Sequence, residues 1–427
     1  GAGPGRGAPD AVDLCGQGEA FCDLRSFSGS VPIPGRGSLF YWYFAAATPS
    51  PEAPLVLWLQ GGPGASSMLG NFFEMGPLTL DGEGRLGRRP AAETWAARLP
   101  LLFVDSPVGT GWSFASGDGG YARNETAVAH DLAALLRRFK ELHPEVPSRL
   151  AIAGESYGGH FVPALSAHLL EHGGPFQLEA IAIGDGLTDP ATQVLVKPQL
   201  AFAFGLLDER QLGEAQELAQ EAHDLAVAGK YVEAFERRAA MEKLVKEASL
   251  INLYDVRTTD SYDFQDERLQ KFFDLNATKD MLHIPRDRTF GTSREVGEHL
   301  AADKMRSQKA NVEKILAAGV RVLLYQGQFD LKDGAASNEA WIRSMRWEGA
   351  AGYLNASREV WRRSDDGRIA GYWRRYMNLE QVVVLGAGHM VPMDQPLSAT
   401  DMIQRFLLRR GASRAPPASP ADHVVLV

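Results

Sequence analysis

The sequence predicts an α/β fold in which helices flank a mostly parallel sheet. Short apolar runs of strand length alternate with longer segments whose apolar residues recur at helical spacing. A polar, often glycine-rich motif follows most of the apolar runs directly. In a parallel sheet, functional residues gather at the carboxyl ends of the strands. We therefore expect a functional site along one edge of the sheet.

Each predicted element has its own local signal. Aromatic and β-favouring residues at 26–46 indicate antiparallel edge strands. Compact apolar runs predict buried strands at 54–59, 101–104, 150–153, 180–183, 320–325 and 381–385. Helical spacing predicts helices at 125–142, from the turn after 153 to about 171, and at about 398–409.

The character of the sequence changes between residues 199 and 307. Segments rich in Glu, Ala, Leu and Lys run through 209–228, 231–249 and 295–314 without clear strand signals between them, which predicts a helical insertion. Gly-, Pro-, Ser- and Ala-rich ends are expected to be flexible. The predicted division is a sheet domain in two parts, 1–198 and 308–410, a helical cap at 199–307, and flexible ends at 1–12 and 411–427.

Bulk composition is that of an ordinary globular protein, with 427 residues, 45% hydrophobic and 23% charged. A net charge of −9 argues against nucleic acid as a partner. No apolar run approaches the roughly 20 residues that span a bilayer, so we expect no membrane span. Two cysteines supply no tetrahedral zinc site, and we expect no metal and no cofactor. The sequence does not decide the oligomeric state and allows a homodimer.

Several signs favour the secretory pathway. Cys15 and Cys22 are seven residues apart, and a disulfide between them is expected, the alternative being free thiols. Three glycosylation sequons begin at Asn124, Asn276 and Asn355. The sequence starts with a Gly/Pro stretch instead of an apolar leader, so any signal peptide is expected to have been removed. Lysosome, vacuole and extracellular space all fit.

The segment around Ser156 predicts an exposed nucleophile. The apolar run 150–153 leads into Gly-Glu-Ser-Tyr-Gly, and a segment of helical length follows. A serine on a sharp strand-to-helix turn requires glycine two residues before and two after, here Gly154 and Gly158, because a Cβ would clash there. The hydroxyl then lies near a helix N-terminus, whose partial positive charge suits a developing oxyanion.

A serine nucleophile needs a base, and the base needs an orienting acid. His389 is the candidate base, because it alone among the ten histidines follows a strand within a glycine-rich turn. The acid should lie between serine and histidine in chain order. Asp185, Asp330 and Asp333 all qualify, and Asp330 is favoured because it follows the strand that precedes the His389 unit.

An oxyanion hole requires two backbone N–H groups. The first is expected from Tyr157, directly after the nucleophile. The second is expected from the glycine-rich loop after the strand 54–59, in which Gly62 is best placed.

Five motifs together resemble the serine carboxypeptidase family. They occur in the family's order over roughly residues 20–410. The motifs are Trp58-Leu-Gln-Gly-Gly-Pro-Gly-Ala-Ser-Ser67, Phe73-Glu-Met-Gly-Pro77, Val104-Asp-Ser-Pro-Val-Gly-Thr-Gly-Trp-Ser113, Gly154-Glu-Ser-Tyr-Gly-Gly159 and Gly388-His-Met-Val-Pro-Met-Asp-Gln-Pro396. This family has an α/β-hydrolase fold with a helical insertion. Gln60 and the composition of the insertion are similar to the vitellogenic-like and retinoid-inducible branch.

The resemblance implies roles for individual residues. It implies a triad of Ser156, Asp330 and His389, in agreement with the reasoning above. It also implies a grip on the substrate's terminal carboxylate by Gln60, Gly61 and Glu155. Glu74 matches a residue that shares a proton with Glu155, and Met390 matches one that lines the pocket of the leaving amino acid. Two departures are Gln60, where many members have Asn, and Ala65, where many have Cys.

The expected function is that of a serine carboxypeptidase, which releases amino acids from peptide C-termini through an acyl-enzyme. Two buried carboxyl groups meet only if one holds a proton, so the pKa of Glu155 should be raised and activity should be favoured at acidic pH. Two alternatives are an acyltransferase that uses the same triad and a lumenal binding protein whose site is vestigial.

Overall fold

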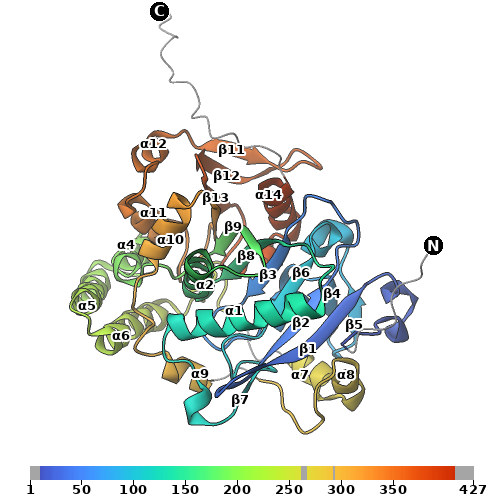
Figure 1. The fold of residues 1–427 in the computed structure, drawn as a ribbon. Coiled ribbons are helices and arrows are strands. Elements are labelled where there is room, and N and C mark those ends of the chain that lie inside the picture. The colour runs from blue at the N-terminus through green and yellow to red at the C-terminus, as the bar shows by residue number, and fades with distance from the viewer. Residues whose placement is uncertain (1–9, 261–266, 292–293, 409–427) are drawn as a thin grey trace, which may run out of the picture.

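A computed structural model describes residues 10–260, 267–291 and 294–408, and its centre is one sheet of eleven strands (Figure 1). The strand order is β1-β2-β6-β3-β8-β9-β10-β13-β12-β11, with β7 paired to β2. The strand bounds are β1 Ser26–Ile33, β2 Gly37–Phe44, β3 Leu55–Leu59, β6 Leu101–Val104, β7 Phe114–Ala115, β8 Arg149–Glu155, β9 Gln177–Gly184, β10 Arg321–Gly327, β11 Glu359–Arg362, β12 Ile369–Tyr376 and β13 Leu379–Val384.

The six central strands, from β6 to β13, pair in parallel, and the outer strands pair antiparallel. The parallel strands are continuous apolar runs because both faces of the sheet are covered. Within β3, Leu55 and Leu57 pack into the core on one face, whereas Val56 and Trp58 pack into the core on the other. A small second sheet consists of β4 Leu78–Leu80 and β5 Leu86–Arg88.

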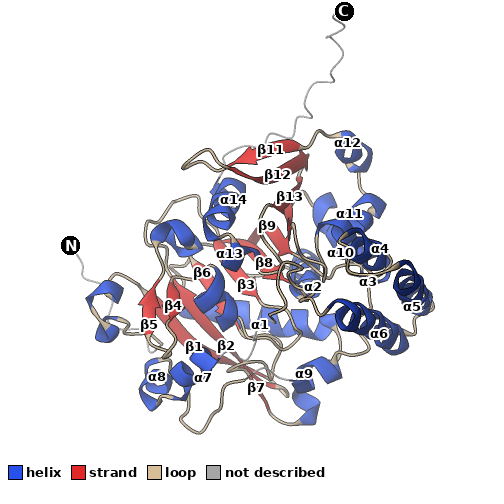
Figure 2. Cartoon of the chain, turned by 180° about the vertical axis from the view of Figure 1, so that it is seen from behind, coloured by secondary structure: helices blue, strands red, loops and turns tan. Residues whose placement is uncertain are grey.

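Helices cover both faces of the sheet. On one face lie α1 Glu125–Leu142, α2 Gly158–His172 and α10 Lys309–Ala317, whose apolar residues share a core with Leu57 (Figure 1). On the other face, α14 Pro396–Leu408 packs into the core that holds Trp58 (Figure 2). Shorter helices are α3 Pro190–Gln193, α11 Ala335–Ser344, α12 Ala350–Asn355 and α13 Val391–Asp394.

The described part of the segment expected to form a helical cap contains helices joined by loops. The pair α5 Glu209–Val227 and α6 Tyr231–Ser249 forms a hairpin at one side of the molecule (Figure 1). The other helices here are α4 Lys197–Ala203, α7 Glu267–Asp274, α8 Asn276–Met281 and α9 Arg294–His299. The Glu/Ala/Leu/Lys-rich segment 295–314 does not form one helix, because α9 and α10 are separated. Between them, Asp303 accepts the Glu125 backbone N–H at 2.8 Å, which fixes a turn against α1.

Three further regions differ from expectation or lie outside it. The sequence pattern did not reveal β11 and β12, which lie at an antiparallel edge and mix charged and aromatic residues with apolar ones. Within the stretch 1–12 that was predicted to be flexible, Val12 is buried and Asp10 contacts His143 at 2.7 Å. Residues 1–9 and the predicted tail at 411–427 lie outside the described residues.

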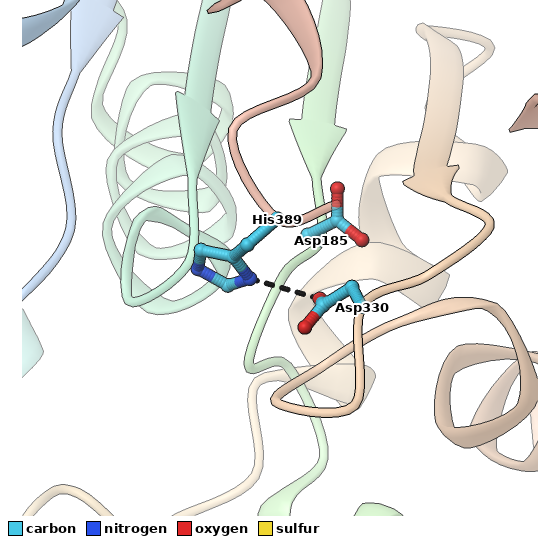
Figure 3. Close-up of side chains that lie close together, drawn as sticks. All are labelled: Asp185, Asp330 and His389. Atoms are coloured by element: carbon cyan, nitrogen blue, oxygen red, sulfur yellow. Dashed lines mark hydrogen bonds and ion pairs between the residues drawn. The ribbon is translucent and has the colours of Figure 1, made fainter. Parts of the chain in front are cut away.

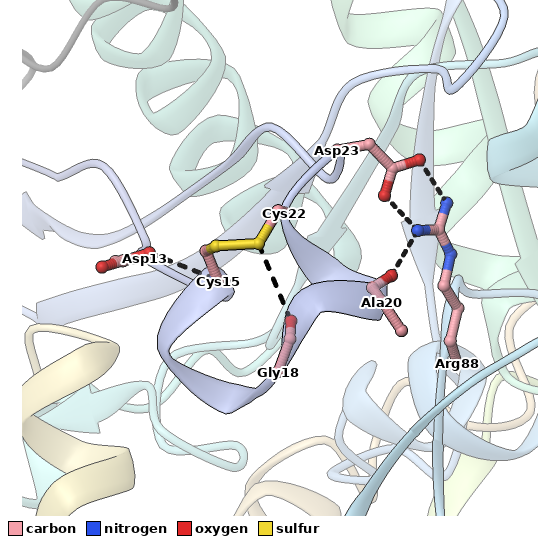
Figure 4. Close-up of a disulfide and its surroundings, with 7 residues drawn as sticks. All are labelled: Asp13, Cys15, Gly18, Ala20, Cys22, Asp23 and Arg88. Atoms are coloured by element: carbon pink, nitrogen blue, oxygen red, sulfur yellow. Dashed lines mark hydrogen bonds and ion pairs between the residues drawn. A yellow bond between two sulfur atoms is a disulfide. The ribbon is translucent and has the colours of Figure 1, made fainter.

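The predicted disulfide between Cys15 and Cys22 is confirmed (Figure 4). It closes a loop of two short helical turns. Arg88 on β5 donates to the Ala20 carbonyl and to both carboxylate oxygens of Asp23, which ties this loop to the second sheet. None of the described helices combines the length and apolar character needed to cross a membrane.

Candidate active site

Polar residues follow the carboxyl ends of the parallel strands, at one edge of the sheet. Gln60 follows β3, Ser156 follows β8, Asp185 follows β9, Asp330 follows β10 and His389 follows β13. Because β3, β8, β9, β10 and β13 are consecutive in the sheet, this topology gathers five distant segments of the chain at one edge.

Ser156 lies on a tight turn between β8 and α2. Its φ of 59° is in the left-handed region, which a non-glycine residue rarely adopts. A Cβ added to Gly154 would lie 2.7 Å from the Leu59 carbonyl oxygen, and one on Gly158 would lie 2.9 Å from it. Glycine is therefore required on both sides of the turn. Ser156 is partly exposed, although its neighbours in the turn are buried.

His389 and Asp330 form a buried hydrogen-bonded pair (Figure 3). His389 Nδ1 is 2.8 Å from Asp330 Oδ2, and both side chains are almost fully buried. The backbone N–H groups of Lys332 and Asp333 donate to the Asp330 carboxylate at 2.6 and 3.1 Å. These bonds fix the orientation of the carboxylate and, through it, of the imidazole.

The other imidazole nitrogen is available. Among the described residues, His389 Nε2 has no hydrogen-bond partner, and it makes no hydrogen bond with Ser156 Oγ. Hydrogen bonds of this kind are often long in ligand-free sites and tighten when substrate binds. Tyr254 packs edge-on against the His389 ring with ring centroids 4.8 Å apart, and its carbonyl accepts the His389 backbone N–H at 2.7 Å.

Two backbone N–H groups lie in the segments next to Ser156. A Cβ on Gly61 would lie 2.6 Å from the Tyr157 nitrogen and 2.8 Å from the Ser156 Cβ, so the loop after β3 touches the turn that holds Ser156. Gly62 follows with a φ of 109°. Among the described residues, no acceptor is found for the N–H of Gly62 or Tyr157. This is the arrangement that an oxyanion hole requires.

Three buried polar side chains, those of Gln60, Glu74 and Glu155, form a linked group next to Ser156. The Gln60 amide donates to Glu155 at 3.1 Å, and its oxygen accepts from the Trp58 indole at 2.8 Å. Glu155 is in turn hydrogen-bonded to Glu74. Burial raises the pKa of Glu74 to about 7. Burial, reinforced by the charge of Glu74, raises the pKa of Glu155 well above its usual range, so the pair retains a proton at acidic pH.

The structure also places the other residues that the sequence singled out. Met390 is buried directly after His389, and Ala65 is buried in the β3 loop. Asp333 donates its backbone N–H to Asp330, and its side chain forms ion pairs with Lys197 and Arg238. Asp185, Asp330 and His389 are the one group in the described ranges whose ligand-type atoms, within 4.8 Å of one another, could hold a metal ion. The triad-type hydrogen bond already uses His389 Nδ1.

Sequence reasoning missed Tyr254. It comes from the segment after α6, 135 positions before His389 in the numbering, and no local pattern marks it. Only the tertiary structure places its ring and carbonyl against the imidazole. The three sequon asparagines, Asn124, Asn276 and Asn355, are exposed.

The family model described as serine carboxypeptidase matches residues 17–409. The chain belongs to the serine carboxypeptidase family. It is 38% identical over 399 residues to serine carboxypeptidase-like 50 of Arabidopsis thaliana, covering 91% of this chain and 88% of that protein. It is 34% identical to the probable serine carboxypeptidase CPVL of Homo sapiens, covering 91% and 84%. Vitellogenic carboxypeptidase of Aedes aegypti is 33% identical, covering 90% and 83%.

Among solved structures, the prohormone-processing carboxypeptidase Kex1 of Saccharomyces cerevisiae superposes with a TM-score of 0.84. The identity is 23%, and the match covers 93% of this chain and 95% of that one. The expected α/β-hydrolase fold is confirmed, and so is the expected resemblance to the vitellogenic-like branch. The protein is a serine carboxypeptidase, an enzyme whose substrates are peptides.

Proposed function

We propose that this serine carboxypeptidase works through a triad of Ser156, His389 and Asp330. The observation that carries the proposal is the buried bond between His389 Nδ1 and Asp330, which leaves His389 Nε2 without a partner on the other side of the ring. In this arrangement Asp330 holds one tautomer of the imidazole, and Nε2 accepts the proton of the serine hydroxyl.

The chemistry follows from these roles. Ser156 Oγ attacks the carbonyl carbon of the last peptide bond while His389 Nε2 takes its proton. The N–H groups of Gly62 and Tyr157 donate to the oxyanion. His389 then protonates the leaving amino acid, the C–N bond breaks, and an acyl-enzyme remains. A water molecule, deprotonated by His389, hydrolyses the ester and restores the serine.

The exopeptidase character is assigned to Gln60, Gly61 and Glu155. The Gln60 amide and a protonated Glu155 carry N–H and O–H donors suited to a terminal carboxylate. When Glu155 or Glu74 ionises, a negative charge opposes that carboxylate. Binding of a free C-terminus should therefore weaken as the pH rises through the raised pKa of this pair, about 7 for Glu74. Met390 is proposed to line the pocket of the leaving residue.

The compartment and the cap are further parts of this proposal. The disulfide and the three exposed sequon asparagines support passage through the secretory pathway, with N-glycans at Asn124, Asn276 and Asn355 and an end point in the lysosome, vacuole or extracellular space. A venom serine carboxypeptidase of Apis mellifera, 33% identical, is consistent with secretion. Residues 199–307 are proposed to cap the site, and a homodimer stays a prediction of the sequence.

Blocked dipeptides with free or amidated C-termini provide the test. We expect the free acids to be cleaved with release of one amino acid, most efficiently at acidic pH. The amides should be cleaved at least about tenfold more slowly, because they lose one charge-assisted contact to the enzyme. Ser156→Ala should lower kcat at least about ten-thousandfold with both substrates. Equal rates for acids and amides would contradict the assigned carboxylate site, and transfer of the acyl group to an added alcohol in preference to water would favour an acyltransferase.

A further inference from the structure

The triad carboxylate Asp330 has a second buried carboxyl group beside it. Asp185 at the end of β9 has an exposed fraction of 0%, and Asp330 has one of 1%. One side-chain atom each of Asp185, Asp330 and His389 lies within 4.8 Å of the other two (Figure 3). Building on the proposed triad, we propose that Asp185 is a positioning residue that stays protonated and donates its proton to Asp330.

The backbone fixes Asp185 in this place. Its φ of 41° is in the left-handed region, and its N–H donates to the Tyr325 carbonyl at 2.9 Å. The Gly327 N–H is 3.0 and 3.1 Å from the two carboxyl oxygens of Asp185. Hydrogen bonds to β10, the strand that leads to Asp330, thus hold both the backbone N–H and the carboxyl group of Asp185. A strained conformation held by its surroundings is typical of functional sites.

Counting hydrogen-bond donors shows which group carries the charge. Asp330 receives the N–H groups of Lys332 and Asp333 and the imidazole of His389, which suits an ionised carboxylate. Asp185 receives the single N–H of Gly327, and no cation in the described ranges forms an ion pair with it. Two buried carboxylates without a cation between them repel strongly, so one of the two holds a proton. The donor count places that proton on Asp185.

The charged and titratable groups around Asp185 agree with this assignment. They are Asp330 after β10, Glu155 before the nucleophile, Tyr325 on β10 and His389 after β13. Burial raises the pKa of Asp185 well above its usual range, and the negative charge of Asp330 and the hydrogen bond between the two carboxyl groups raise it further. Consequently His389 faces one negative charge on this side instead of two.

The charge of Asp185 can be inferred from the acid limb of the pH profile for labelling of Ser156, because protonation of His389 stops the reaction there. The probe is a neutral alkyl fluorophosphonate, whose reaction with Ser156 does not depend on the carboxylate site of Glu155. Labelling rates are measured against pH in the wild type, Asp185→Asn and Asp185→Ala. An asparagine keeps the shape of a protonated aspartate and donates an N–H to Asp330, and its oxygen still accepts from Gly327.

We expect Asp185→Asn to label within about threefold of the wild-type rate, with the midpoint of the acid limb unchanged, because no charge has been removed. Asp185→Ala should label about tenfold or more slowly, since Asp330 loses a donor. If Asp185 were ionised, Asp185→Asn would remove a negative charge, ease deprotonation of His389 and move the acid limb to lower pH by about one unit. That shift would overturn the inference.

Two further outcomes are separable. If the wild type is not labelled at Ser156, the proposed triad itself fails. If it is labelled and only the acid limb of Asp185→Asn moves, the role of Asp185 alone is wrong. Should Asp185→Asn not fold, Asp185→Ser is used in its place, because a hydroxyl also donates to Asp330 without charge.

Discussion

Two buried carboxyl pairs are present at this edge of the sheet, and they differ in what surrounds them. The Glu74–Glu155 pair receives one N–H donor, from Gln60, and apart from the contact between the two carboxyl groups, three of its four oxygens have no hydrogen-bond partner in the described structure. The Asp185–Asp330 pair receives three backbone N–H groups and the His389 imidazole. The first pair has free hydrogen-bonding capacity for a ligand, whereas the second is already occupied by the protein.

This difference separates two uses of the same electrostatic arrangement. Each pair holds one proton, because two buried negative charges repel each other. In the proposed function, the proton of the first pair determines whether a negatively charged chain end binds. In the inferred role of Asp185, the proton of the second pair fixes the carboxylate of the proposed triad and leaves one charge beside the imidazole. The two pairs should therefore respond differently to pH and to amide substitution.

The largest expected contrast comes from Glu155→Gln. In the wild type, kcat/KM for a free-acid peptide should fall by up to about tenfold per pH unit as the Glu74–Glu155 pair loses its proton. The variant keeps a neutral donor at position 155 and should show a clearly shallower alkaline limb. The measurement is kcat/KM against pH with free-acid peptides, with labelling by the neutral phosphonate as the control. Identical alkaline limbs in the two proteins would refute the role of this pair.

The pairs should also affect the free energy of unfolding. A carboxyl group with a raised pKa in the folded state keeps its proton where the unfolded chain has lost it, so stability falls as the pH rises through that window. For Glu74 the window runs from 4.5 to about 7. We expect the unfolding free energy to decrease by up to about 1.4 kcal/mol per pH unit per group. Glu74→Gln should flatten this slope in urea titrations, and an unchanged slope would contradict the account.

The smallest effect on catalysis is expected at a buried acid outside both pairs. Asp131 on α1 is nearly buried, bonds to Arg36 at 3.2 Å, and has a pKa raised by burial to about 6. Asp131→Asn should cost about 1–3 kcal/mol of stability and leave the pH profile of kcat/KM unchanged. A shift of that profile would mean that buried carboxyl groups in general, not the two pairs, determine it.

Local signals in the sequence predicted most of the sheet domain. Neighbouring residues in the sequence are enough to mark the apolar strands and the glycines around Ser156. The parallel arrangement of the strands then places the motif residues at one edge of the sheet. The elements that sequence reasoning missed depend on distant partners. The edge strands β11 and β12 lack an apolar run, and α9 and α10 are divided by a contact between Asp303 and the start of α1.

The same distinction applies within the site. Candidate triad residues could be named because each follows a predicted strand. The packing of Tyr254 on His389 and the pairing of Asp185 with Asp330 could not, because they depend on the tertiary arrangement of segments far apart in the chain. Asp185 qualified in the sequence only as an alternative to Asp330, and the structure shows that the two lie side by side.

The most direct test is a crystal structure after reaction with a peptidyl phosphonate that ends in a free carboxylate. The account predicts a covalent bond from phosphorus to Ser156 Oγ and a phosphoryl oxygen within hydrogen-bonding distance of the N–H groups of Gly62 and Tyr157. It also predicts His389 Nε2 beside the serine oxygen, and the carboxylate on Gln60 and Glu155. A bond to another residue, or a carboxylate that lies away from Glu155, would contradict it.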